Sequence, residues 1–460
     1  MLRRTLLMRI GSMVILWLLA VTIVDAEKPQ RPPNVILVLA DDLGWQELGC
    51  YGNQFNQTPQ LDALAKRGVR FTDAYAAAPV CSPQRAALLT GLTPARLGIT
   101  NVLGPRSQKH LPPARVTLAE VLRSHGYATG IVGKWHLSGY ANHGAPEVGP
   151  QRQGFDEVLI TAEYGIGGGD YFHPYKFAPS VQARLPDEHL IDRCNLEAVE
   201  FVERHAAKPF FLYLSHYAVH RAIRGRADWL AHFAEKPAAG KNSIAPHNNP
   251  HLAAQLAQID EGIGQLTAAL RQRGLLENTL FIFTSDNGGE STVTTNGPLR
   301  AGKSTLYEGG LRIPLILRGP GCKADTTCAV PVASEDLFPT ILALCSLPLP
   351  EGIQIDGKSF AALLEGQTKN YRNPLCWHYP LSEPHFLGGG SSGAIREKNW
   401  KLIEFFSDGK TELYDLDNDL GETKDLSRSH PQIASRLQEK LAAWRKQMGA
   451  EVATREEAIQ

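Results

Sequence analysis

A single cysteine followed by an arginine four positions later is the first feature of this sequence that can carry chemistry. The segment reads Cys81-Ser82-Pro83-Gln84-Arg85 and continues into a run of small and apolar residues. Serine followed by proline is typical of a helix start, so we expect a helix to begin here with Cys81 just ahead of it. Backbone N–H groups at a helix N-terminus favour anions, and Arg85 adds a planar, permanently charged guanidinium one turn further on. The segment predicts an anion site around Cys81, although a buried cysteine beside a surface arginine gives the same pattern.

Oxygen-bearing side chains follow two of the expected strands. Asp41 and Asp42 come directly after the first aliphatic run, and Asp286 and Asn287 come directly after a later one. Ligands of open α/β sheets gather at the carboxyl ends of the strands, so these side chains can converge. Three carboxylates and an amide oxygen suit Ca²⁺ or Mg²⁺ rather than zinc. Taken alone, each pair is better explained as an ordinary turn, because Asp and Asn are common turn residues.

Two segments resemble the signatures of one enzyme family. Residues 81–85 match the pattern C-x-P-x-R of the type I sulfatases, in which the cysteine is oxidised to formylglycine. Residues 126–137 are similar to the second sulfatase signature, and the similarity continues through residues 307–314 and 412–416. Two matches in the right order are much stronger than either alone. The resemblance implies an alkaline-phosphatase-like fold: an α/β sandwich with a large, mostly parallel sheet, and a smaller C-terminal α+β subdomain with an antiparallel sheet.

The resemblance also implies a role for each candidate residue. The metal ligands would be Asp41, Asp42, Cys81, Asp286 and Asn287, holding Ca²⁺ or, as the alternative, Mg²⁺. The catalytic residues would be Cys81, Arg85, Lys134, His136, His220 and Lys303. Of these, Lys134, His220 and Lys303 would also contact substrate. His216 is the alternative to His220, because the family often has Thr-Pro after this histidine and this chain has Arg221-Ala222.

The mechanism implied by the family begins with hydration of the formylglycine aldehyde. One hydroxyl, relieved of its proton by Asp286, attacks sulfur. Arg85, Lys134 and Lys303 stabilise the transferring sulfuryl group, and His220 or Lys303 protonates the leaving alcohol. The second hydroxyl then expels sulfate and restores the aldehyde.

The rest of the chain alternates between expected strands and helices, which predicts an α/β sandwich with a mostly parallel sheet. Strands are expected at the aliphatic runs 34–40, 128–132, 209–215, 279–285 and 312–317. Helices are expected from Pro59 to Gly68, from the capping box of Thr117 and Glu120 to Gly126, and from Pro250 to Gly274. Further on, a hairpin of strands 393–404 and 411–416 with its turn at 407–409 precedes an amphipathic helix over 431–448.

The first 26 residues have the pattern of a signal peptide. Three arginines precede an apolar run from Met13 to Val24 that is short for a bilayer span, and Ala26 suits cleavage. An uncleaved anchor is the alternative, and no later run is long and apolar enough to cross a membrane. We therefore expect a secreted or periplasmic protein with a catalytic domain over residues 27–350 and a C-terminal subdomain over 351–460.

The charge content bears on the kind of substrate, and the cysteine content bears on disulfide pairing. The chain has 47 basic and 47 acidic residues, which gives no sign of nucleic-acid binding, so an anionic substrate must be attracted by a local patch. Setting Cys81 aside leaves six cysteines, an even number that permits disulfides in an exported protein. Cys322 and Cys328 bracket a short polar loop and are the first candidate pair. The oligomeric state does not follow from the sequence.

The predicted function is hydrolysis of sulfate esters, with a sulfated carbohydrate attacked near a chain end as substrate and a formylglycine-generating enzyme as maturation partner. Trp377, His378, Tyr379 and His385 offer aromatic and imidazole groups that can stack on a sugar, and His378 is taken as a substrate contact, although packing explains them equally well. One alternative is a phosphomonoesterase, phosphodiesterase or phosphonate hydrolase of the same superfamily. Another is an inactive protein that binds anionic glycans, but such a protein would have lost the nucleophile or the metal ligands, and this chain retains them.

Overall fold

The protein is described by a computed structural model that covers residues 31–104, 107–139, 148–162, 171–237, 247–367, 371, 374–450 and 452. The predicted signal peptide lies outside these residues. Pro32–Gln460 forms one compact unit, and the division of the mature chain at residue 350 stays a prediction. No helix in the described ranges combines the length and the apolar character that a membrane span requires.

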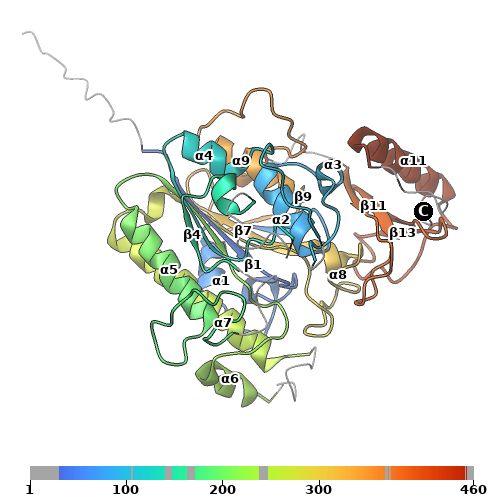
Figure 1. The fold of residues 1–460 in the computed structure, drawn as a ribbon. Coiled ribbons are helices and arrows are strands. Elements are labelled where there is room, and N and C mark those ends of the chain that lie inside the picture. The colour runs from blue at the N-terminus through green and yellow to red at the C-terminus, as the bar shows by residue number, and fades with distance from the viewer. Residues whose placement is uncertain are drawn as a thin grey trace, which may run out of the picture. The chain divides into compact units, whose positions relative to one another are not determined.

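A large central sheet organises the fold (Figure 1). Its strands are β1 (Asn34–Ala40), β2 (Val69–Tyr75), β3 (Ala128–Gly133), β4 (Glu157–Leu159), β5 (Phe210–Ser215), β6 (Thr279–Ser285), β7 (Arg312–Arg318), β8 (Thr326–Cys328) and β9 (Val332–Ala333). They lie in the order β4-β3-β5-β1-β6-β7-β2-β8, with β9 paired to β2. The run from β4 to β6 is parallel, whereas β7 runs antiparallel to both β6 and β2. The predicted α/β class with a mostly parallel sheet is confirmed.

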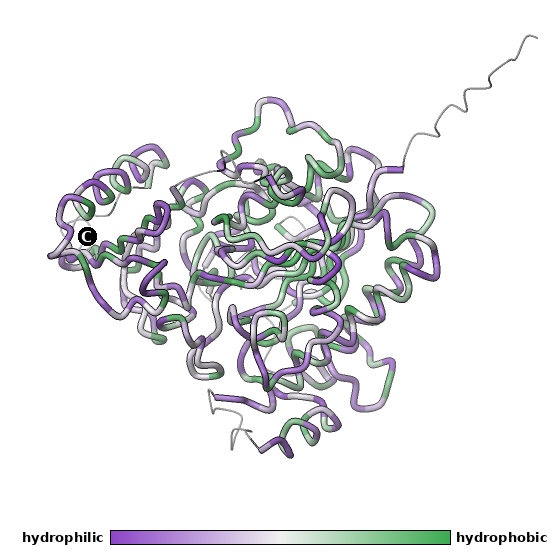
Figure 2. Tube along the Cα trace, turned by 180° about the vertical axis from the view of Figure 1, so that it is seen from behind, coloured by the Kyte–Doolittle hydropathy of each residue, from purple (hydrophilic) through white to green (hydrophobic). Residues whose placement is uncertain are grey.

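Helices cover both faces of this sheet. The helices of the chain are α1 (Pro59–Lys66), α2 (Cys81–Thr90), α3 (Pro94–Leu97), α4 (Leu118–Ser124), α5 (Leu190–Arg204), α6 (Ala227–Ala234), α7 (Pro250–Gln272), α8 (Glu308–Leu311), α9 (Leu337–Leu344), α10 (Ala361–Leu364) and α11 (Pro431–Met448), of which α11 packs on a second sheet. On β1, Val35 and Leu37 belong to the core cluster under α2, α4 and α9, while Ile36 and Val38 belong to the cluster under α1, α5 and α7. Because both faces are buried, the strands are continuously apolar, and the tube view shows hydrophobic colour concentrated in them (Figure 2).

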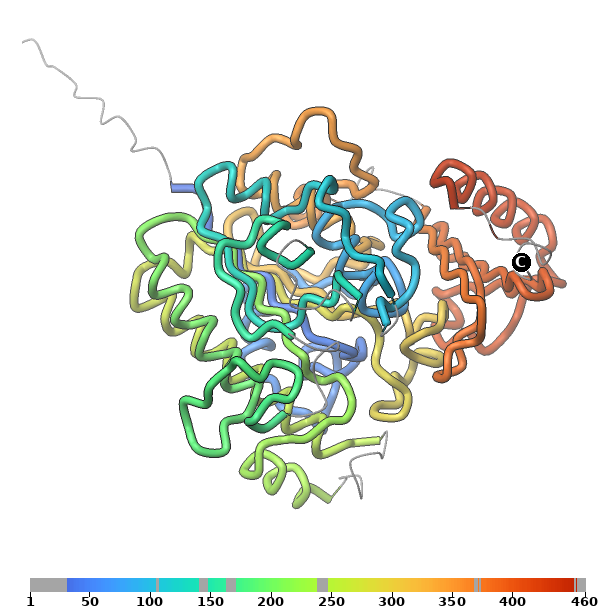
Figure 3. Tube along the Cα trace, in the orientation of Figure 1, coloured from blue at the N-terminus to red at the C-terminus, as the bar shows by residue number. Residues whose placement is uncertain are grey.

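A second sheet is antiparallel and contains β10 (Leu375–Tyr379), β11 (Ser392–Glu397), β12 (Trp400–Phe405) and β13 (Thr411–Asp415), in that order. Helix α11 packs on it through Leu437 and Leu441. The segment around residue 300 lies beside these strands (Figure 3), and Arg300 Nη1 donates to the hydroxyl of Tyr414 at 2.8 Å. The segment that leads to α8 is therefore attached to the C-terminal sheet.

Three local predictions differ from the structure. The expected strand 393–404 is wrong: it is two strands that reverse at Lys398, where φ is 57°, and no glycine or proline marks that turn. Helix α2 begins at Cys81 itself, after an extended Val80, because a proline is tolerated anywhere in a first turn. All seven cysteines are free thiols, so Cys322 and Cys328 are not paired.

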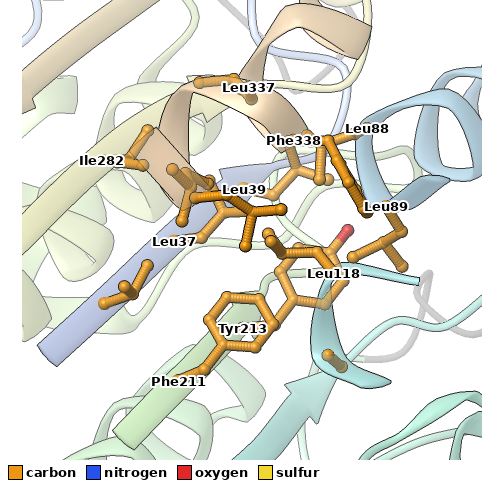
Figure 4. Packing of buried hydrophobic residues seen from close by; sticks show 14 of the residues in the cluster. Leu37, Leu39, Leu88, Leu89, Leu118, Phe211, Tyr213, Ile282, Leu337 and Phe338 are labelled. Atoms are coloured by element: carbon orange, nitrogen blue, oxygen red, sulfur yellow. The ribbon is translucent and has the colours of Figure 1, made fainter. Parts of the chain in front are cut away.

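Helix α2 is held firmly against the sheet. Leu88 and Leu89 of α2 pack with Leu39 of β1 and Phe338 of α9 in one buried layer (Figure 4). Burying a leucine side chain of this size contributes roughly 1.5–3 kcal/mol. The start of α2, where Cys81 lies, is consequently a rigid support at the edge of the sheet.

Candidate active site

The carboxyl ends of four neighbouring strands bring the predicted residues together. The register pairs Ala40 of β1 with Ser285 of β6, and Gly133 of β3 with Ser215 of β5. The residues that follow these strands therefore emerge side by side at one edge. Gly133 is required here, because its φ is 99° and a Cβ would lie 2.1 Å from the carbonyl oxygen of Ser215.

Two lysines neutralise the paired aspartates at the end of β1. The Nζ of Lys134 forms an ion pair with Asp41 Oδ2, and the Nζ of Lys303 donates to Asp42 Oδ2 at 2.6 Å. Burial alone would raise the pKa of Asp41, but Lys134 and Arg85 outweigh it and hold that pKa below its ordinary value. Lys303 and a nearby histidine likewise outweigh burial at Asp42, whose pKa is also lowered. Both carboxylates are therefore ionised.

Arg85 reaches from α2 to the end of β6. Its Nη2 and Nε donate to Asp286 Oδ2 at 2.7 and 3.1 Å, and its Nη1 donates to Ser215 Oγ at 2.6 Å. The Nη2 also lies 3.5 Å from Asp41 Oδ2. Burial and the charge of Asp41 raise the pKa of Asp286, so its carboxylate depends on the guanidinium for its charge. The predicted surface alternative for Arg85 is excluded, because the side chain is fully buried.

Cys81 lies inside this charged cluster. Its Sγ is 3.7 Å from Asp41 Oδ1. Burial raises the pKa of the Cys81 thiol to about 12, and the charges of Lys134 and Lys303 offset only part of that effect. The unmodified residue is therefore a neutral thiol at pH 7, which is a weak nucleophile.

The donor set fits a hard divalent cation. Potential ligand atoms of Asp41, Asp42 and Cys81 lie within 4.8 Å of one another. Asn287 Nδ2 donates to Asp42 Oδ1 at 2.7 Å, whereas Asn287 Oδ1 is buried without a hydrogen-bond partner among the described residues. A buried acceptor without a partner next to the Asp42 carboxylate is a group that an oxygen-preferring cation could satisfy.

The two candidate histidines of the loop after β5 lie in different surroundings. The Nε2 of His220 is 3.8 Å from Asp42 Oδ2, and the hydroxyl of Tyr171 holds the His220 carbonyl at 2.7 Å. His216 is buried, neither of its ring nitrogens has a partner among the described residues, and burial lowers its pKa to about 3. The structure thus brings His220, and not His216, to the metal-ligand cluster.

The remaining two candidates are His136 and His378, and their predicted roles stay predictions. The Nε2 of His136 is 3.3 Å from the carbonyl oxygen of Leu103, whose N–H donates to Ser82 Oγ at 3.1 Å. His136 therefore supports the segment beside the start of α2.

His378 lies on β10 against Phe406, with a ring-centroid distance of 5.5 Å, and burial lowers its pKa to about 4. The predicted contact of His378 with substrate stays a prediction.

Sequence reasoning missed the groups that hold the charged residues in place. Ser215 Oγ binds Arg85 and also donates to the Lys134 carbonyl oxygen at 2.7 Å, so it joins both signature segments. Its position as the last residue of a predicted strand was the available signal. Tyr171 offered no such signal, because its partner is a backbone carbonyl in a distant loop.

Comparison with known proteins agrees with this geometry. The sulfatase family model matches residues 33–347, and the model described as N-sulphoglucosamine sulphohydrolase, C-terminal, matches residues 301–447. The chain belongs to the sulfatase family, within the alkaline-phosphatase-like superfamily.

Relatives and solved structures extend over most of the chain. Arylsulfatase A of Homo sapiens is 36% identical over 86% of this chain and 83% of its own length. N-acetylgalactosamine-6-sulfatase of Homo sapiens is 33% identical over 73% and 67%. The crystal structure of Ps i-CgsB in complex with k-i-k-neocarrahexaose superimposes with a TM-score of 0.80 at 29% identity, covering 93% of this chain and 96% of that one. The protein is a sulfuric ester hydrolase, as these relatives are.

Proposed function

We propose that this protein is an exported sulfatase that hydrolyses sulfate esters of carbohydrates, using a formylglycine formed from Cys81 and a divalent cation, with Ca²⁺ as the first choice. One observation carries the proposal. A buried Cys81 lies against Asp41 at the start of a helix that is packed firmly on the sheet, and ligand atoms of Asp41, Asp42 and Cys81 cluster there. The signal-peptide pattern of the first 26 residues supports export.

Arg85, Lys134 and Lys303 form what we call the anion cradle, the set of positive charges that would surround the bound sulfate group. Formylglycine supplies an aldehyde whose hydrate can attack sulfur, and the bound cation supplies positive charge beside the sulfuryl oxygens. Asp41, Asp42, Asp286 and Asn287 would hold the cation together with residue 81. Because Arg85 binds both Asp286 and Asp41, it orients these ligands and adds a fixed charge.

Lys134, which pairs with Asp41, and Lys303, which pairs with Asp42, add two further positive charges to the cradle. Both ammonium charges act on residue 81, so an ester bound there is stabilised by both. Lys303 and His220 flank Asp42, and either can donate a proton to the departing alcohol oxygen. This arrangement stabilises charge as it develops on the leaving group.

Named relatives support the carbohydrate substrate. N-acetylgalactosamine-6-sulfatase is a relative, and the solved structure of Ps i-CgsB holds a neocarrahexaose. Steryl-sulfatase of Mus musculus is also 32% identical over 76% of this chain, so a steroid sulfate is the alternative that a substrate panel must include.

The test combines a variant with a substrate panel. Cys81→Ala is expected to abolish hydrolysis and to leave thermal unfolding nearly unchanged, while Cys376→Ala, which changes a half-buried cysteine of β10, stays active. Mass spectrometry of the peptide that contains residue 81 is expected to show an aldehyde in place of the thiol. The panel contains sulfated mono- and oligosaccharides, steroid sulfates, aryl sulfates and aryl phosphates. A preference for phosphate esters or steroid sulfates, or an active Cys81→Ala variant, would refute the proposal.

A further inference from the structure

Phe386 is an aromatic residue in the loop between β10 and β11 that the catalytic mechanism does not use. Its side chain is 77% exposed, compared with 61% for Leu185 and 51% for Leu349, the other large exposed apolar side chains in the described part of the chain. The ring stacks on the imidazole of His385 with a centroid distance of 4.5 Å and an angle of 29°. A single exposed apolar residue is common on a protein surface, so only its position relative to the active site can indicate a function.

The loop that carries Phe386 is seated on the residue next to Lys303. A Cβ at Gly389 would lie 1.7 Å from the carbonyl oxygen of Ser304, so the two backbones are in direct contact and only glycine fits. The N–H of His385 donates to the Gly389 carbonyl at 2.7 Å, which closes a tight turn with Phe386 at its tip. Ser304 N–H in turn donates to the Pro79 carbonyl oxygen at 2.8 Å, close in sequence to Cys81. The turn therefore contacts the segment that carries Lys303, and that segment is hydrogen-bonded to the residues just before Cys81.

Charges of the catalytic cluster reach His385. Burial and the positive charge of Lys303 lower the pKa of His385, and the charges of Glu290 and Asp42 oppose them. Glu290 is buried and pairs with Arg221 at 3.1 Å, directly after His220 in the chain. His385 therefore lies within electrostatic range of Lys303, Asp42 and Glu290, and the exposed Phe386 ring stacks on its imidazole.

We infer that Phe386, backed by His385, is a stacking platform for the sugar ring that bears the sulfate ester, and so a specificity-determining residue. This inference rests on the proposed function. When the sulfate group enters the charged cradle, the ring that carries it lies at the rim, where the cluster offers charge but little apolar surface. An aromatic face next to the cradle packs against the C–H face of a pyranose, and the stacked imidazole keeps the ring from collapsing onto the surface.

The platform makes a kinetic prediction that differs from that for a cradle residue. Phe386→Ala is expected to raise the KM for sulfated mono- and oligosaccharides about 3- to 10-fold with kcat nearly unchanged, because the stacking contact is lost equally from the ground and transition states. Phe386→Trp keeps an aromatic face and is expected to restore the KM. Inhibition by inorganic sulfate, which occupies the cradle alone, is expected to keep its constant in Phe386→Ala.

The matched control is Leu349→Ala, which removes an exposed apolar side chain from the segment between α9 and α10 and is expected to keep the wild-type KM. Three results would overturn the platform while the proposed function stands: a wild-type KM in Phe386→Ala, a KM that Phe386→Trp fails to restore, or a parallel loss of sulfate inhibition. If the wild-type enzyme hydrolyses steroid sulfates and no sulfated sugar, the proposed function and the platform both fail.

Discussion

Arg85 at the start of α2 and Asp286 at the end of β6 form a fully buried ion pair in which two nitrogens of one guanidinium donate to the same carboxylate oxygen, at 2.7 and 3.1 Å. The pair joins the helix that carries Cys81 to a strand end that carries two of the proposed metal ligands. Because neither partner is exposed to water, removal of one leaves an uncompensated charge in the interior.

Arg85→Lys and Arg85→Ala distinguish the effect of the positive charge of residue 85 from the effect of its hydrogen-bond geometry. Lysine keeps the charge but cannot bind Asp286 and Ser215 together, so we expect kcat to fall by about 100-fold with a modest loss of stability. Alanine leaves Asp286 unpaired and is expected to cost about 3–5 kcal/mol of unfolding free energy as well. Steady-state kinetics and urea denaturation check both. Wild-type kcat in Arg85→Lys would contradict the role of the paired nitrogens.

Metal removal tests the ligand set. Exhaustive chelation is expected to abolish turnover and to lower the thermal midpoint, because Asp41 and Asp42 lose a shared counter-ion. At a cation concentration about 100-fold above Kd, re-addition contributes about 2.7 kcal/mol to folding. Asn287→Leu removes the buried Oδ1 and is expected to lose most of that increment. Calorimetry with Ca²⁺ and with Mg²⁺ in parallel identifies the preferred ion, and an unchanged midpoint in both arms would exclude the site.

Arg300 is expected to position Lys303. Its Nη1 donates to the Tyr414 hydroxyl and to the Glu422 carbonyl oxygen, both at 2.8 Å, and its guanidinium lies 4.0 Å from the Tyr307 ring centroid. Arg300→Gln frees this segment from the C-terminal sheet and is expected to lower kcat about 10-fold, since small displacements of a charged group are costly.

The control for Arg300 is Arg184→Gln, which breaks a surface pair with Glu200 and is expected to keep the wild-type kcat. Arg300→Lys is expected to recover part of the activity. If Arg300→Gln lowers the unfolding midpoint but leaves kcat and KM unchanged, the residue is structural and does not position Lys303.

His216 predicts how stability depends on pH. Burial lowers its pKa from 6.5 to about 3, so the unfolded chain binds a proton that the folded protein excludes. The free energy of unfolding therefore rises with pH between about pH 3 and pH 6.5, by at most about 1.4 kcal/mol per pH unit. It levels off above pH 6.5, the pKa of the histidine in the unfolded chain. In His216→Phe, the slope is expected to decrease by nearly one proton at pH 5 and by about half a proton at pH 6.5. Denaturation curves at several pH values give the slope directly, and equal slopes in the two proteins would show that His216 is protonated in the fold.

Local patterns in the sequence were sufficient to predict most strands and helices and the residue types of the candidate active site. The apolar runs at β1, β5 and β6 are buried on both faces, and continuous burial imposes continuous hydrophobicity, so these strands were predicted within one residue. The capping box of Thr117 and Glu120 is also present, because a cap is completed within one turn. Asp41 and Asp286 were placed at strand ends for the same reason: their positions depend only on where the neighbouring apolar run stops.

Only the tertiary structure decided which of these groups meet. The reversal at Lys398 carries no glycine signal, and His216 and His220 are equivalent by residue type, yet one lies in the core and the other beside Asp42. The strand order β3-β5-β1-β6 brings together residues that are far apart in the chain, and that order depends on the packing of whole helices against both faces of the sheet. A residue's type determines what chemistry it can do, whereas its partners depend on long-range packing that no local pattern encodes.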